Sequence, residues 1–197
     1  MTWQIRLAEL RDAAEIAEIY RPAVVSAPIS FELEPPDSQE FEHRIEKTLA
    51  GHPWLVCENE DRVAGYAYAS RHRERAAYQW CVDTSVYVHS NFHRRGVGQA
   101  LYTSLLRILV AQGFYTAYAG ITLPNPGSVG LHESVGFKPL CVYRNVGYKL
   151  GSWYDVGWWE LALQPTAAAP RPPLKLTEIE SGSSWNEILA SGLSRIH

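Results

Sequence analysis

The sequence is poor in the features that mark secreted, membrane-spanning and nucleic-acid-binding proteins. Its three cysteines, Cys57, Cys81 and Cys141, lie far apart without metal-ligand spacing, so we expect small buried residues of a reducing compartment. No apolar run approaches the roughly 18 residues of a membrane-spanning helix, and the N-terminus lacks the order of a secretory signal. A net charge of -3 argues against a nucleic-acid or anionic-membrane partner. We therefore expect a cytoplasmic protein without a metal.

Length and composition indicate one substantial core. Of the 197 residues, 46% are hydrophobic and 20% are charged, as in an ordinary globular domain. We expect this domain to span residues 1–164. Residues 165–197 begin with a Pro- and Ala-rich stretch. They are expected to form an extended tail, with a weak helix near residues 183–193, that packs on the domain or on a partner subunit.

Periodicity predicts an α/β domain with a mixed sheet. Alternation indicates strands over residues 4–7 and 81–88. Residues 54–58 and 63–70 are expected to form a hairpin, residues 115–123 a further strand, and residues 140–163 a second hairpin. Apolar spacing indicates helices after Asp12, after Asp37 or Ser38, over residues 98–112, and shortly after residue 123. We expect Asp12 to cap the first helix and Pro22 to interrupt it.

The stretch after the strand at 81–88 carries the most informative pattern. It reads "HRRGVGQA" (residues 93–100), so two arginines and two glycines stand where a strand becomes a helix. Glycines let backbone N–H groups approach a ligand, and the helix N-terminus and the arginines add positive charge. The pattern predicts a cradle for phosphate or pyrophosphate, although a solvated basic helix start has the same composition.

The spacing excludes the usual nucleotide loops, because neither G-x-x-x-x-G-K-[ST] nor a complete G-x-G-x-x-G is present. A second segment, "ITLPNPGSVGLHESVGF" (residues 121–137), begins a helix just after a strand. Its Asn, Ser and His side chains would face the same sheet edge as the basic loop. We expect both strand ends to open onto one cleft, where α/β proteins usually bind ligands.

These segments together resemble the GNAT superfamily of N-acetyltransferases. The acyl-CoA loop of that family, (Q/R)-x-x-G-x-(G/A), is matched by residues 93–98, with His93 departing at the first position. "RERAAYQWCVDTSVYV", "LPNPGSVGLHESVGF" and "GYKLGSWYDVGWWELAL" are similar to the phosphinothricin N-acetyltransferases. The resemblance covers residues 3–180. It implies a mixed, mostly antiparallel sheet flanked by helices, and acetyl-CoA as co-substrate.

The resemblance also implies roles for particular residues. The implied cofactor contacts are the strand backbone at Val86, Tyr87 and Val88, the loop at Arg94, Arg95, Gly96, Val97, Gly98 and Gln99, and the thiol-end residues Asn125 and Ser128. The implied substrate contacts are Phe31, Arg73, Arg75, Tyr78, Ser85, Tyr87 and Val156.

Acetyl transfer to an amine needs a base, because an α-amine is largely protonated at neutral pH. The family's glutamate corresponds to Asp83, whose side chain is one methylene shorter, so we expect a water relay. A strand-end carboxylate paired with an arginine is the structural alternative. His132 stands seven residues after Asn125, and is expected to act as an acid or hydrogen-bond donor toward the CoA thiol. A structural histidine with satisfied nitrogens is its alternative.

The remaining basic residues are sorted by their surroundings. At least one of Arg71, Arg73 and Arg75 is expected to face solvent. We select Arg75 for the carboxylate or phosphinate of the substrate, because an arginine fork matches such oxyanions. The other histidines treated as surface residues are His43, His52, His72 and His89.

We therefore expect an acetyl-CoA-dependent N-acetyltransferase for the α-amine of phosphinothricin or a related amino acid such as methionine sulfoximine. Attack is expected to be direct, because no nucleophile arrangement suggests an acetyl-enzyme. The alternatives are an acetyltransferase for another small amine, such as a polyamine, and a catalytically weak acyl-CoA-binding protein. Herbicide or antibiotic resistance and ordinary metabolism both stay open as roles. The cluster of Trp153, Trp158 and Trp159 predicts a homodimer.

Overall fold

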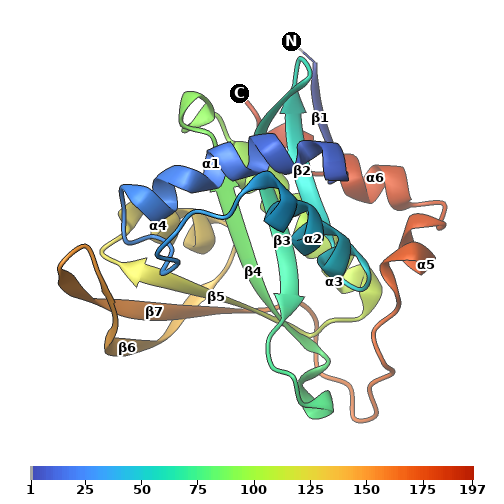
Figure 1. Cartoon of the computed structure of the whole chain (residues 1–197). Coiled ribbons are helices and arrows are strands. Elements are labelled where there is room, and N and C mark those ends of the chain that lie inside the picture. Colours follow the sequence, from blue (N-terminus) through green and yellow to red (C-terminus); the bar gives the residue numbers. More distant parts are fainter. Residues whose placement is uncertain (1) are drawn as a thin grey trace.

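The computed structural model of the chain describes residues 2–197 and contains an open seven-stranded sheet (Figure 1). The strands are β1 (Trp3–Leu7), β2 (Trp54–Asn59), β3 (Arg62–Arg71), β4 (Cys81–Val88), β5 (Thr116–Leu123), β6 (Lys138–Lys149) and β7 (Ser152–Ala162). They lie in the order β1-β2-β3-β4-β5-β7-β6. β4 and β5 are parallel, and the other neighbouring pairs described are antiparallel. The prediction of a mixed, mostly antiparallel sheet is confirmed.

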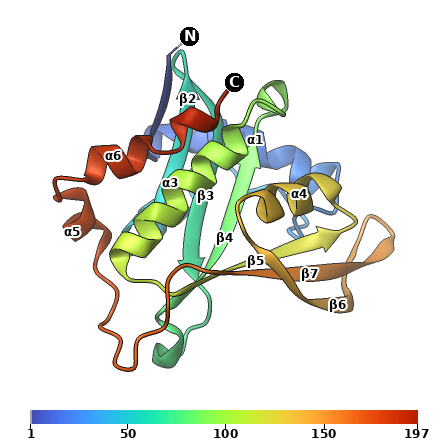
Figure 2. The same cartoon turned by 180° about the vertical axis from the view of Figure 1, so that it is seen from behind.

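Helices cover both faces of the sheet (Figures 1 and 2). α1 (Ala13–Val25) and α2 (Ser38–Leu49) lie on one face, and α3 (Val97–Gln112) and α4 (Pro126–Ser134) lie on the other. Each face has its own hydrophobic core: Leu55 and Cys57 of β2 pack under α3, whereas Trp54 and Val56 pack under α1 and α2. Because both of its faces are buried, β2 is a continuous apolar run without the alternation of a half-exposed strand.

Two details of the first helix differ from expectation. Pro22 does not end it, because α1 continues to Val25. A residue at position 22 would normally donate its amide to the carbonyl of Glu18, which proline cannot do. Pro22 and Glu18 are both exposed, so solvent can replace the missing bond. Asp12 precedes the helix but makes no side-chain cap bond to it. Its carboxylate is used by Arg6 instead.

The cysteines are less uniform than expected. Cys57 is buried, and its burial raises the pKa of the thiol to about 12. Cys81 is half-buried, and Cys141 is exposed on β6, so the prediction of three buried cysteines is wrong for Cys141. Within residues 2–197, no helix has the length and hydropathy needed to cross a bilayer.

The segment after β7 is more ordered than an extended tail. It contains α5 (Leu176–Glu180), α6 (Trp185–Ala190) and the short 3-10 helix η4 (Leu193–Arg195), and it runs beside α3 (Figure 2). The hydroxyl of Ser104 donates to the carbonyl of Leu189 at 2.7 Å and accepts from the amide of Gly192 at 3.1 Å. A Cβ at Gly192 would lie 1.9 Å from the carbonyl oxygen of Ala100, so glycine permits this close docking.

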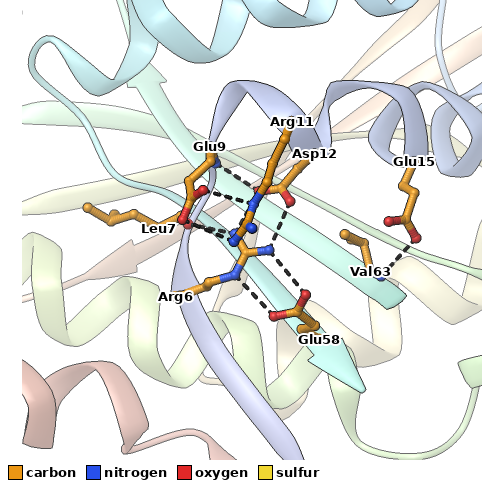
Figure 3. Close-up of polar contacts among 8 residues, drawn as sticks. All are labelled: Arg6, Leu7, Glu9, Arg11, Asp12, Glu15, Glu58 and Val63. Carbon is orange, nitrogen blue, oxygen red and sulfur yellow. Dashed lines mark hydrogen bonds and ion pairs between the residues drawn. The ribbon is translucent and has the colours of Figure 1, made fainter. Parts of the chain in front are cut away.

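One ion cluster joins the first strand to the rest of the domain (Figure 3). The guanidinium of Arg6 donates to both carboxylate oxygens of Asp12, at 2.7 and 2.8 Å. It also donates to both oxygens of Glu58 on β2, at 3.1 and 3.3 Å. The Asp12 side chain is only 5% exposed, so its charge depends on this partner. Hydrogen bonds to both acids raise the pKa of Arg6.

We expect Arg6→Ala to lower the free energy of unfolding by about 3 kcal/mol, because it leaves a buried carboxylate without its cation. Arg11→Ala is the control, since Arg11 pairs with Glu9 in solvent, at 69% and 54% side-chain exposure. That variant should lose under about 1 kcal/mol. Urea denaturation of the two variants measures both values, and equal losses would contradict a structural role for the Arg6 cluster.

Candidate functional site

The two parallel strands at the centre of the sheet diverge after a short paired stretch (Figure 2). Residues 81–83 of β4 pair with residues 116–118 of β5. β4 continues to Val88, while β5 continues to Leu123 with β7 on its other edge. Beyond Asp83, the facing edges of β4 and β5 have no neighbouring strand among the described residues. We call this opening the fork. Its free backbone N–H and C=O groups suit an extended ligand, and the residues at 86–88 lie along it.

The loop between β4 and α3 has the backbone of an anion cradle. Arg94 and Gly96 are left-handed, with φ of 60° and 80°, and such alternation turns successive N–H groups toward one point. The amide of Ala100 donates to Gly96 at 2.8 Å as the first turn of α3 closes. The amides of Val97, Gly98 and Gln99 therefore have no carbonyl within the helix to reach. The guanidinium of Arg95 lies 5.7 Å from the centre of the Phe92 ring.

His93, which departs from the family's loop pattern, ties this cradle to the fork. Its Nε2 lies 2.9 Å from the carbonyl oxygen of Val88. A carbonyl only accepts, so Nε2 carries the proton and donates. The bond fixes the end of β4 against the start of the loop.

The end of the described chain packs against the cradle loop. The amide of His197 donates to the carbonyl of Arg95 at 3.2 Å. A Cβ at Gly96 would lie 1.9 Å from the carbonyl oxygen of Arg195. Glycine is therefore required at Gly96 twice, for its positive φ and for the close approach of the tail.

α4 lies close to the first turn of α3. A Cβ at Gly98 would lie 2.8 Å from a methyl group of Leu131, so this glycine sets the spacing of the two helices. The side chain of Asn125 caps α4 by accepting from the amide of Ser128 at 3.1 Å. Both residues thus lie at the N-terminus of α4, just after the end of β5.

His132 is buried on the α3 side of the fork, with both nitrogens engaged. Nδ1 lies 2.7 Å from the carbonyl oxygen of Ser128, and Nε2 lies 2.8 Å from the hydroxyl of Tyr102. These partners assign the proton to Nδ1 and make Nε2 an acceptor for Tyr102. Burial lowers the pKa of His132, which favours this neutral form. The hydroxyl of Thr84 donates to the Tyr118 carbonyl at 3.2 Å, where the strands separate.

Asp83 lies on the opposite face of β4, at the last paired position before the fork, opposite Tyr118. Its hydrogen-bond partner is His72, at 2.6 Å between Nδ1 and Oδ1, and not an arginine. Burial raises the pKa of Asp83, while the His72 bond and the charge of Arg73 oppose the rise. A carboxylate with a raised pKa is a better proton acceptor near neutral pH.

The surface assignment of four histidines is therefore wrong in part. His43 is exposed on α2. His52 is half-buried and stacks on Phe114, with 5.6 Å between ring centres. His72 is half-buried beside Asp83, and His89 is also half-buried. Histidine is hydrophobic enough to fill such positions, which periodicity alone does not distinguish from surface.

The arginine-rich segment between β3 and β4 is mostly exposed. Arg73 donates to the carbonyl of His72 at 2.8 Å, and its charge reaches Asp83. Arg75 precedes the short 3-10 helix η2 (Ala76–Tyr78) and is exposed. Tyr78 is 42% exposed, with its ring 6.1 Å from that of His72. Arg73 and Tyr78 therefore lie next to the His72–Asp83 pair, whereas Arg75 lies two residues beyond Arg73 in the exposed segment.

The other predicted substrate residues line the same face of the sheet. Ser85 and Tyr87 follow Asp83 at alternate positions of β4. Tyr87 stacks on Tyr66, with 5.3 Å between ring centres. Val156 of β7 pairs with Thr122 of β5. The hydroxyl of Thr122 donates to the carbonyl of Ile29 at 3.4 Å, and this brings the loop between α1 and α2 to the end of β5.

Phe31, on that loop, packs against the β6–β7 hairpin. A Cβ at Gly147 would lie 2.2 Å from its ring. Nearby, Lys149 donates to the carbonyl of Ser30 at 2.6 Å, and the hydroxyl of Ser30 lies 2.6 Å from that of Tyr20. These bonds hold the loop in one position.

Sequence reasoning missed His72, Tyr102 and Tyr118. Tyr102 is fully buried in the middle of α3, where a tyrosine among leucines already signals a hydroxyl that needs a partner. His72 and Tyr118 are recognised only from strand register, because the β3–β4 pairing brings His72 beside Asp83 and the β4–β5 pairing brings Tyr118 there.

Comparison with known proteins identifies the family. The model of the acetyltransferase (GNAT) domain matches residues 5–158. A phosphinothricin N-acetyltransferase of Streptomyces viridochromogenes is 40% identical over 176 residues, covering 89% of this chain and 96% of the relative. An L-methionine sulfoximine/L-methionine sulfone acetyltransferase of Salmonella typhimurium is 33% identical over 165 residues, covering 83% and 96%.

A solved structure agrees with these relatives. The crystal structure of a GNAT superfamily phosphinothricin acetyltransferase from Sinorhizobium meliloti in complex with AcCoA superimposes with a TM-score of 0.81 at 31% identity. The match covers 89% of this chain and 99% of the other. The prediction from the loop at residues 93–98 is confirmed, and the chain belongs to the acetyltransferase (GNAT) family.

Proposed function

We propose that the chain transfers the acetyl group of acetyl-CoA to the α-amine of phosphinothricin or a related amino acid such as methionine sulfoximine. The observation that carries this proposal is the fork between β4 and β5. An anion cradle lies at its open end and a half-buried carboxylate, Asp83, lies at its foot. Relatives that acetylate phosphinothricin or methionine sulfoximine support the choice of substrate.

The residues present fit acetyl-CoA. The cradle requires the absence of a Cβ at Gly96, and its free amides suit a pyrophosphate. The open edge of β4 at Val86 and at the Val88 amide suits the amide groups of a pantetheine arm. The Val88 carbonyl already accepts from His93. Asn125 and Ser128, at the N-terminus of α4, would lie toward the thiol end. When bound, acetyl-CoA supplies the thioester whose acetyl carbon the amine attacks.

Asp83 is the proposed base. It takes a proton from the substrate ammonium, directly or through a water, so that the amine nitrogen has a free electron pair. Its position at the foot of the fork is where an amine on the α1 side and a thioester on the α3 side would meet. The N–C bond then forms as the C–S bond breaks, without an acetyl-enzyme.

His132 is proposed to act on the thiol side through Tyr102. Both of its nitrogens are engaged, so it accepts from the Tyr102 hydroxyl and holds it near Thr84. Arg73 and Arg75 are proposed for the acidic groups of the substrate, with Phe31, Tyr78, Ser85, Tyr87 and Val156 as the walls of its site.

We expect the purified chain, given acetyl-CoA, to release CoA thiol with L-phosphinothricin and L-methionine sulfoximine. Thiol release with ordinary L-amino acids should be slower, and spermidine should not react, because a trication is repelled by the arginine-rich segment. Turnover of spermidine alone would point to a small-amine acetyltransferase. CoA binding by calorimetry without any turnover would point to a binding protein.

Arg75→Ala should raise the KM for the amino acid about 10- to 100-fold, because a charge-assisted hydrogen bond contributes about 1.5–3 kcal/mol. The KM for acetyl-CoA should stay unchanged. Arg71→Ala is the matched control, because Arg71 is 56% exposed and pairs with Glu74. Initial-rate kinetics of both variants test the assignment, which is wrong if the two behave alike.

We also propose a homodimer built on the β6–β7 hairpin, at the edge of the sheet. Large apolar side chains there are between 45% and 61% exposed, and exposed apolar surface on an edge hairpin suits a subunit contact. They are Leu140, Val142, Tyr143, Val146, Tyr148, Leu150 and Trp153.

Residues 1–164 would form the domain and residues 165–197 the tail that packs on it. Three free cysteines support a reducing, cytoplasmic location.

Light scattering should give twice the mass of the chain, and Trp153→Asp should halve it, because a charge would replace an aromatic anchor of the interface. Leu10→Asp is the control, since Leu10 is 49% exposed before α1 and outside the hairpin. A wild-type chain that scatters as a monomer would rule out the dimer, and dissociation by both variants would place the interface elsewhere.

A further inference from the structure

The imidazole of His72 lies across the foot of the fork. Its Nδ1 is 2.6 Å from Oδ1 of Asp83 on β4. Its ring stacks on Tyr118 of β5, with 4.6 Å between ring centres and 30° between planes. Asp83 and Tyr118 are partners in the last pair of the β4–β5 ladder. One side chain, from the end of β3, therefore contacts both strands at the point where they separate.

Other aromatic rings restrict the imidazole. Tyr78 and Trp158 lie edge-on to it, at 6.1 and 6.3 Å between ring centres. The His72 side chain is 15% exposed, whereas the carboxylate of Asp83 is 30% exposed. The more buried group of the pair is thus the imidazole, which is held by rings on three sides. The carboxylate keeps one oxygen, Oδ2, for another partner.

The direction of the hydrogen bond follows from its chemistry. An ionised carboxylate only accepts, so Nδ1 of His72 carries the proton and donates. Such a bond stabilises the ionised form of Asp83 and fixes the rotation of its carboxylate. The charged and titratable groups around Asp83 are His72 and Arg73 before η2, Tyr68 on β3, Cys81 on β4 and Tyr118 on β5.

We propose that His72 is a positioning residue for the acetyl-transfer reaction, which aims the short Asp83 carboxylate at the acceptor amine and keeps it ionised. The inference rests on the proposed function, in which Asp83 is the base. Aspartate cannot turn as far into the fork as glutamate, because it lacks one methylene. A donor bonded to Oδ1 holds Oδ2 in a single orientation, so this bond offsets the shorter reach of the aspartate side chain.

Of the His72–Asp83 pair, only Asp83 exchanges a proton with the substrate. The substrate ammonium gives one proton to Oδ2, directly or through a water, and becomes the neutral amine. Nδ1–H of His72 remains donated to Oδ1 throughout. As the N–C bond forms and the C–S bond breaks, the nitrogen loses its second proton to the departing thiolate, which leaves as the CoA thiol. The proton on Asp83 passes to solvent, and the His72–Asp83 pair is restored.

Two variants separate the hydrogen bond from the packing. His72→Phe keeps a ring against Tyr118 but removes the donor. His72→Asn keeps a donor close to the position of Nδ1 but cannot titrate. His52→Phe is the matched control, because His52 also stacks on a ring, that of Phe114, and is not bonded to Asp83.

The first readout is the titration of the Asp83 carboxyl by carbon NMR in the free protein, which needs no turnover. His72→Phe should raise the pKa of Asp83 above that of the wild type, because burial then acts without the opposing hydrogen bond. His72→Asn should restore it toward the wild-type value, and His52→Phe should leave it unchanged. An unchanged Asp83 titration in His72→Phe would overturn the proposal.

The second readout is the pH profile of kcat/KM for the amino acid. A base must be ionised, so activity is lost as the pH falls through its pKa. In His72→Phe this acid limb should move to higher pH, and kcat should fall about 10-fold, with the KM for acetyl-CoA unchanged. His72→Asn should recover most of kcat.

The outcomes distinguish a failure of the proposed function from a failure of the positioning role of His72. A wild-type protein that acetylates no amino acid defeats the proposed function, while the NMR titration still tests the His72–Asp83 bond. A wild-type protein that is active and a His72→Phe variant with the same kcat and acid limb defeat the positioning role alone. Full activity of Asp83→Asn would show that the base is another group.

Discussion

The structure depends on the short length of the β4–β5 ladder. A parallel pair that stays in register would pair all the backbone groups that the two strands turn toward each other. Here the pairing stops after residues 81–83 and 116–118, and β5 is held instead by β7 on its other edge. The edges beyond this stretch have no neighbouring strand among the described residues, so their N–H and C=O groups are open to a ligand or to water. The sheet thus has an opening at its centre, and β5 is held in the sheet there by its pairing with β7.

Two polar networks meet at the foot of this opening, one from each face of the sheet. On the α3 side, His132, Tyr102 and Thr84 are buried, and both nitrogens of His132 are engaged, by the Tyr102 hydroxyl and the Ser128 carbonyl. On the α1 side, Asp83 and His72 are partly exposed, and one carboxylate oxygen is not needed by His72. The difference matters, because a fully satisfied network is rigid while a partly satisfied one can exchange protons with a ligand. The asymmetry matches a reaction in which an acceptor enters from one side and a donor from the other.

Much of the fold could be predicted from local pattern. The strand at residues 81–88 and the helix that ends at Gln112 follow directly from alternation and from the glycine after the helix. The basic loop is recognisable because its arginines stand directly before Gly96, which allows the left-handed φ of the turn. These features are encoded in a few neighbouring residues, so they need no knowledge of the tertiary structure.

The rest depends on contacts between distant residues. His72 is one of several histidines in polar surroundings until the register places it against Tyr118. Asp12 has the sequence position of a helix cap, but the guanidinium of Arg6 on β1 binds its carboxylate with two hydrogen bonds. The order of the tail depends on Gly192 meeting Ala100, a contact across nearly half of the chain. The role of each of these residues is decided by its neighbours and not by its own propensity.

The docking of the tail on Gly96 has a thermodynamic consequence. The amide of His197 and the carbonyl of Arg195 lie against the same loop whose N–H groups form the cradle. If the loop has one shape with the tail docked and another without it, a ligand that prefers the first shape also tightens the tail. Reciprocity then requires the tail to tighten the ligand by the same factor. Tail and ligand would then be coupled through the loop at Gly96, and a tag or fusion joined after His197 would act on the cradle through the same loop.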